Sequence, residues 1–120
     1  MKNQMKVKVL KTKFTKHIEI TPELVERALL DLIITLNDTI FDWEGFRETC
    51  GQVNKELNET PGVEVVEVPL GKEWIDTVKY LAKLLKTTEE KALNYAVYRR
   101  IQQLDMEEHR KILRKRFGLD

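Results

Sequence analysis

The sequence has a single cysteine, no long apolar run and too few metal-binding residues for a typical zinc site. With Cys50 alone the chain cannot form an internal disulfide, and one cysteine plus two histidines fall short of four zinc ligands. No apolar stretch approaches the ~18 residues of a membrane span. The start, MKNQMKVKVLKTKF, lacks the apolar segment and cleavage site of a secretory signal. We therefore expect a cytoplasmic protein without a membrane span, a bound metal or another cofactor.

The motifs of common catalytic sites are also missing. There is no phosphate-binding Gly-rich loop, no Gly-x-Ser-x-Gly turn and no His-Glu-x-x-His pair. His17 and His109 lie far apart in the sequence, one beside an expected strand and one in a charged helix. Cys50 lies on the apolar side of an expected helix, which predicts a buried thiol rather than a reactive nucleophile. We therefore expect that the protein is not an enzyme and has no catalytic residues.

What the chain does have is an uneven distribution of charge. The formal net charge of its 120 residues is +1, yet residues 1–16 carry six lysines and no acid. Residues 17–70 carry twelve acids against three bases, and residues 71–120 carry twelve bases against eight acids. Either these blocks are solvated helix faces of different sign, or the basic ends attract a polyanion that the acidic middle repels.

The clearest pattern of secondary structure lies in residues 63–104. Residues 63–70 are rich in β-branched side chains and end in Pro-Leu before a glycine, which predicts a short strand. Apolar residues then recur at helical spacing in 74–85 and again in 92–104. Between these helices, Thr87 as N-cap with Glu90 three residues later fits a capping box. One such strand cannot be stable alone and needs a partner strand.

This order of elements resembles the ribbon-helix-helix (Arc/MetJ-like) family of DNA-binding proteins over residues 63–104. In that family two strands pair into an antiparallel ribbon that enters the major groove, and the start of the second helix holds a DNA phosphate. The resemblance implies core positions for Val66 and Val68. It implies DNA contacts by two groups of residues, the groove-facing Val65, Glu67 and Pro69 and the phosphate-binding Thr87 and Thr88. The basic residues add further candidates for phosphate contacts, namely Lys86 between the two helices and Arg114, Lys115 and Arg116 at the end of the chain.

The N-terminal half predicts a strand and two helices of its own. Lysines alternate with apolar residues at the start of 6–14, which predicts a strand with one solvated face. Thr21 as N-cap, with Pro22 at the first helical position, predicts the start of a helix. Asp42 is the N-cap candidate of the next helix, which contains Cys50.

The two halves of the chain are alike in this order. Ile18-Glu-Ile20 precedes two helices, as Val66-Glu-Val68 does 48 residues later. Residues 6–57 are therefore either a degenerate first strand-helix-helix repeat or a helical extension of a homodimeric core. A tandem repeat would pair the basic N-terminal strand with the acidic second strand inside one chain.

We predict a mainly α-helical, ribbon-helix-helix-like protein with a short two-stranded β-ribbon. Its expected parts are an N-terminal unit (1–60), a ribbon-helix-helix unit (61–104) and a basic helical tail (105–120). The predicted function is binding of double-stranded DNA, as a homodimer or a tandem pseudo-dimer, by a transcriptional regulator or an accessory factor of mobile DNA. The alternative is a small phage- or plasmid-type interaction module that inhibits a host protein and does not read DNA. The acidic strand favours a protein partner, and the basic ends favour DNA.

Overall fold

The computed structural model describes residues 4–12, 17–39 and 42–119, and the chain runs twice through the order strand, helix, helix. The elements are β1 (Met5–Lys11), α1 (Pro22–Asp38), α2 (Trp43–Glu59), β2 (Glu64–Leu70), α3 (Lys72–Leu85) and α4 (Glu89–Arg116). The predicted fold class, mainly α with a two-stranded ribbon in a repeated strand-helix-helix order, is confirmed.

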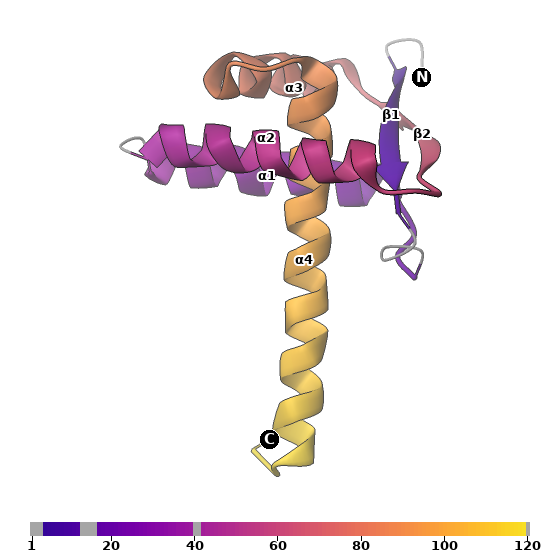
Figure 1. Cartoon of the computed structure of the whole chain (residues 1–120), viewed down its shortest axis with the longest axis vertical. Helices are drawn as coiled ribbons and strands as arrows, with labels where there is room; N and C mark the ends of the chain where they lie inside the picture. The colour runs from indigo at the N-terminus through magenta and orange to yellow at the C-terminus, as the bar shows by residue number, and fades with distance from the viewer. Residues whose placement is uncertain (1–3, 13–16, 40–41, 120) are drawn as a thin grey trace.

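The ribbon forms within one chain, because β1 pairs antiparallel with β2 (Figure 1). Val7 lies opposite Val68, and Val9 lies opposite Val66. Val9 and Val68 are buried, so this face of the ribbon closes the core as alternation along a strand requires. The Lys-rich strand therefore pairs with the Glu-containing strand, as the tandem repeat predicts.

The alignment of Ile18-Glu-Ile20 with Val66-Glu-Val68 is wrong. Residues 17–20 form a turn, a bend and irregular backbone, and the partner of β2 is the earlier segment Met5–Lys11. Ile20 is buried ahead of α1 as a core residue and not as part of the ribbon. The end of the predicted strand, 13–14, lies outside the described residues.

The long helix α4 occupies the middle of the molecule. Its buried residues run from Ala92 to Val97 and include Ile101. In Figure 1, α2 crosses in front of α4 and α1 crosses behind it, and α4 packs against both. One hydrophobic core contains residues of all six elements, so the two halves of the chain share it.

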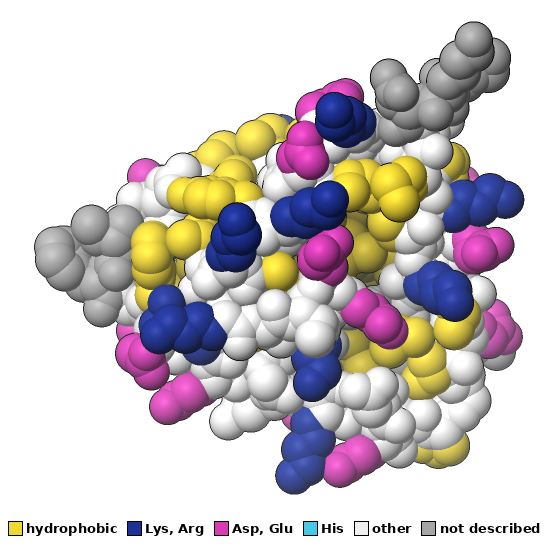
Figure 2. All heavy atoms as spheres, turned by 90° about the horizontal axis from the view of Figure 1, so that it is seen from above, with side chains coloured by type: hydrophobic (Ala, Val, Ile, Leu, Met, Phe, Trp, Pro, Cys, Tyr) yellow, Lys and Arg dark blue, Asp and Glu magenta, His cyan; other side chains and the backbone are white. Residues whose placement is uncertain are grey.

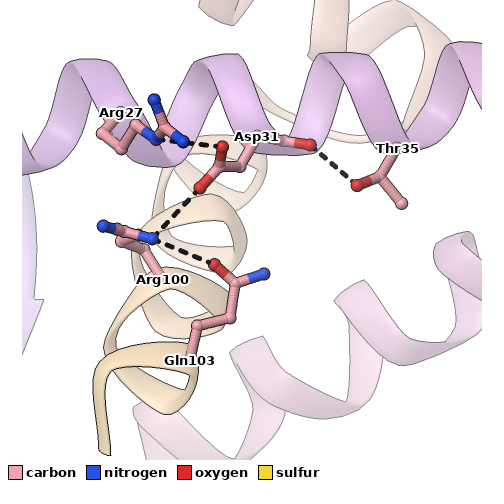
Figure 3. Close-up of polar contacts among 5 residues, drawn as sticks. All are labelled: Arg27, Asp31, Thr35, Arg100 and Gln103. Carbon is pink, nitrogen blue, oxygen red and sulfur yellow. Dashed lines mark hydrogen bonds and ion pairs between the residues drawn. The ribbon is translucent and has the colours of Figure 1, made fainter. Parts of the chain in front are cut away.

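A half-buried ion-pair network fixes α1 against α4 (Figure 3). The Asp31 carboxylate lies 3.2 Å from Nε of Arg27 and 3.4 Å from Nη1 of Arg100. The same Arg100 nitrogen donates to Oε1 of Gln103 at 3.4 Å. The Asp31–Arg100 contact crosses from α1 to α4, while the other two lie within one helix each and orient its partners, so the network favours a single register between the helices.

A buried asparagine joins α4 to the edge of the ribbon. Oδ1 of Asn94 accepts from the backbone N–H of Leu10 at 2.8 Å, and Nδ2 donates to the carbonyl of Glu90 at 2.9 Å. Asn94 is only 2% exposed. It therefore satisfies a donor on the edge of β1 that would otherwise be left without a partner.

Threonines cap the starts of α1 and α4, whereas Asp42, the predicted N-cap of α2, makes no capping hydrogen bond through its side chain. Oγ1 of Thr21 accepts from Leu24 N at 3.1 Å, which confirms the predicted cap of α1. At α4 the N-cap is Thr88, whose Oγ1 accepts from Lys91 N at 3.2 Å. The prediction that Thr87 is the cap is therefore wrong by one residue. The third helical residue is then Lys91, so the reciprocal capping box with Glu90 is not formed.

The preceding hydrogen bonds explain this shift of one residue. Thr87 N donates to Ala82 O at 3.0 Å, and Lys86 N donates to Lys83 O at 3.2 Å. Lys86 itself is left-handed, with φ 53°. This is the Schellman pattern that ends a helix, so Thr87 completes the end of α3 and only Thr88 is free to cap α4.

Replacing Asn94 with Leu should lower the free energy of unfolding by about 1–3 kcal/mol, because Leu10 N–H loses its acceptor. Denaturant unfolding followed by circular dichroism measures this loss. Asn58→Leu on the exposed end of α2 is the matched control and should have little effect. Equal losses in the two variants would contradict a special role for Asn94.

Thr88→Ala should cost about 0.5–2 kcal/mol of stability, because it removes the side-chain acceptor at the start of α4. Thr87→Ala should cost much less, since its contribution to the helix end is made by its backbone. Denaturant titrations of the two single variants separate these positions. If Thr87→Ala lost more stability than Thr88→Ala, the N-cap of α4 would be Thr87, as the sequence pattern predicted.

Candidate nucleic-acid interface

The outward face of the ribbon carries residues of both strands. Val65, Glu67 and Pro69, which the resemblance places toward a groove, are all exposed on β2. The structure adds Lys6 and Lys8 of β1, which lie opposite Pro69 and Glu67 respectively. This face therefore has two positive charges and one negative charge.

A second set of basic residues surrounds the turn between α3 and α4. Lys79 and Lys83 lie one helical turn apart on α3, and Lys86 ends that helix. Together with Thr87, Thr88 and the acidic Glu89 they line an open depression of about 660 Å³ at the start of α4. A helix start offers unpaired backbone N–H groups and a positive end of the helix dipole, which favour an anion. Lys86, Thr87 and Thr88, which follow one another in the sequence, thus all line this depression.

The other side of this turn is basic as well, because α2 packs beside it. A depression of about 350 Å³ is lined by Lys55, Lys86 and Lys91, and its lining residues include Arg47 but no carboxylate. Nε of Arg47 donates to Leu84 O at 3.0 Å, so this side chain is held against the end of α3. We refer to Lys55, Lys79, Lys83, Lys86 and Lys91 as the turn lysines.

The ribbon and the turn are neighbours, with acidic side chains between them. Lys6 and Lys8 line a shared depression of about 240 Å³ with Glu89 and Glu90 of the first turn of α4. Figure 2 shows the end of the molecule that includes α3, where Lys and Arg side chains are spread among acidic side chains and apolar patches. The interface is therefore a mixed surface with its basic residues concentrated around the turn.

The two second helices of the repeat are placed differently. The first turn of α4 lies next to β1, whereas α2 begins at the end away from the ribbon and ends near β2 (Figure 1). The halves thus share an order of elements but not a symmetric arrangement.

Arg114, Lys115 and Arg116 do not join this surface. They occupy the last turn of α4, where the side chains are exposed. Figure 1 shows this end of α4 at the far end of the long axis, which spans 47 Å. A DNA contact by these residues would have to be made separately from one at the ribbon or the turn.

Cys50 is buried, as predicted, and lies at the side of the depression of about 350 Å³ next to α2. Burial raises its pKa to about 11, so the thiol is neutral near pH 7 and a poor nucleophile. Among the described residues, no cluster of three or more His, Cys, Asp or Glu side chains is arranged to hold a metal ion. Over the same residues, no helix is both long and apolar enough to cross a membrane.

The sequence interpretation missed several members of the surface. Lys6 and Lys8 had a usable signal, because they alternate with Val7 and Val9, but the repeat alignment used the wrong strand. No sequence signal pointed to Lys55 and Lys91, since they lie together at the turn only because α2 packs beside it.

No model of a protein family matches the chain, and no curated protein or solved structure matches it either.

Proposed function

We propose that this protein binds double-stranded DNA, mainly through phosphates, with the turn lysines as anchor and the lysines of β1 beside them. The observation that carries the proposal is the set of five turn lysines around the start of α4. None of the ion pairs among the described residues uses one of these lysines. Their charges are therefore available for an anion.

The backbone at Lys86 supports this function. A non-glycine residue in the left-handed region costs about 1–2 kcal/mol, and glycine would avoid the cost at this helix end. Lysine provides instead a positive charge at a position shared by both basic depressions. A conformational cost at this position is consistent with a binding role.

The ribbon suggests that contacts with bases are few. Glu67 lies directly opposite Lys8, and Val65 and Pro69 offer no side-chain hydrogen bonds. Glutamate can accept from the cytosine amino group, but it also repels phosphates. Phosphate contacts hold a protein on DNA without reading its sequence. The proposed role is thus that of a regulator or accessory factor on DNA, acting as a tandem pseudo-dimer within one chain.

Changing Lys79, Lys83 and Lys86 to Gln should weaken binding to a mixed-sequence duplex. It should also lower the salt dependence, since each lost phosphate contact reduces the slope of log K against log salt by about 0.9. Fluorescence anisotropy over a salt series measures both. The matched control changes Lys111, Lys115 and Arg116 to Gln at the far end of α4 and should leave the slope nearly unchanged. If the wild-type protein does not bind at low salt, the proposal is wrong.

The ribbon face favours a second candidate function, binding of a protein partner. Val65 is 56% exposed and lies on the same face as Glu67 and Pro69. An apolar and acidic strand of this kind suits a basic, apolar protein surface better than a DNA groove. In this case the protein would act as an inhibitor or adaptor of that partner.

Glu67→Lys distinguishes the two functions. If the ribbon faces DNA, removing the repulsion should raise the affinity for mixed-sequence duplex severalfold and steepen its salt dependence. Lys8→Gln is the matched control and should lower the affinity. Circular dichroism must show a folded protein, because two lysines facing each other across the ribbon cost some stability. An unchanged DNA affinity in both variants would remove the ribbon from the DNA interface and favour a protein partner.

A further inference from the structure

The end of α4 projects from the molecule as a single helix. Its last buried residue is Ile101, and every residue of 105–119 is exposed. Figure 1 shows this segment, which we call the C-terminal projection, extending below the crossing of α1 and α2. At its start the projection is tied to the rest of the chain, since Nε2 of His17 lies 2.9 Å from Oδ1 of Asp105, but none of its side chains is buried.

Three large apolar side chains of the projection lie on one of its faces, while Ile112, which is 54% exposed, lies about 100° from Leu113 around the helix axis. Met106, Leu113 and Phe117 are 57%, 37% and 68% exposed. They are separated by seven and four residues, so they lie within about 40° of one another around the helix axis. This spacing gives a narrow apolar stripe of the kind that pairs two helices.

The charges of the projection are divided along its length. Its first part contains three acids, Asp105, Glu107 and Glu108. The part that follows contains five bases, Arg110, Lys111, Arg114, Lys115 and Arg116. A parallel partner of the same sequence would place like charges side by side. An antiparallel copy would place the acidic part of each helix beside the basic part of the other.

We propose that the C-terminal projection pairs with the same segment of a second copy in an antiparallel helix pair. Met106 of each copy then lies beside Phe117 of the other, with Leu113 near the two-fold axis. Such an interface is isologous, since the same patch serves both copies. The ribbon is already complete within each chain, so this contact joins two pseudo-dimers and leaves both ribbons in place.

The size of the contact sets its strength. The stretch from Met106 to Phe117 is 12 residues and about 18 Å long, and a helix pair of this length buries less area than a standard stable interface. The dimer should therefore be weak and in rapid exchange with monomer. Salt should weaken it, because the acidic and basic parts attract each other across the pair.

Sedimentation velocity of the full chain over a concentration series tests the contact. Wild type should shift from monomer to dimer, whereas Leu113→Glu and Phe117→Glu should remain monomeric and folded. The matched control is Ile34→Glu on α1, where an apolar residue is 48% exposed, and it should dimerise like wild type. A wild type that stays monomeric throughout, or loss of the dimer in Ile34→Glu alone, overturns the proposal.

Disulfide cross-linking tests the orientation. Under mild oxidation, a mixture of Met106→Cys and Phe117→Cys chains should form mixed dimers, and neither variant alone should cross-link efficiently. Cys50 is buried and can stay in place. Efficient cross-linking of each variant with itself would show a parallel pair and overturn the proposal. The proposal would also be overturned if the wild type formed no dimer and Leu113→Glu lost DNA binding, because the apolar stripe would then contact DNA.

Discussion

The pairing of β1 with β2 inside one chain is the constraint on which the other contacts depend. A two-stranded ribbon is marginal by itself, so its inner valines must be covered by helices. Because the strands come from different halves, the helices of both halves are brought against the same face, and one core results. α4 lies closest to this junction, since Asn94 bonds the free edge of β1. The ion pair between Asp31 and Arg100 then fixes α1 against α4.

Local patterns predicted most of the fold because helix periodicity and caps act over a few residues. The apolar spacing of 74–85 and 92–104 marked α3 and α4, and Thr21 marked the start of α1. The choice between 5–11 and 18–20 as the first strand could not be made locally, because both contain β-branched residues next to charges. It is decided by which segment can oppose Val66 and Val68. The sequence also could not tell which of Thr87 and Thr88 caps α4. The end of α3 at Lys86 uses the backbone of Thr87, so Thr88 is the cap.

Those parts of the candidate site whose residues belong to one strand or one helix could be predicted from the sequence. The resemblance to the ribbon-helix-helix family placed Val65, Glu67 and Pro69 on one outward face of the second strand, and all three are exposed on β2. The surroundings of the α3–α4 turn were only partly predictable, because Lys55 belongs to α2 and lies beside the turn only through the packing of α2. The basic end of the chain was correctly read as helical. Its separation from the turn follows from α4 continuing without a bend, which no local pattern indicates.

The central position of α4 has a consequence for the order in which the protein is made. A ribosome releases β1 and α1 long before α4. Val25, Leu29 and Leu32 of α1 are buried in the finished molecule, in a core to which α4 contributes. Until then these side chains have no complete cover, and β1 has no partner until β2 emerges. Exposed apolar surface and unpaired strands favour aggregation of incomplete chains. A nascent chain that pauses before Glu89 therefore depends on the exit tunnel and on chaperones for protection.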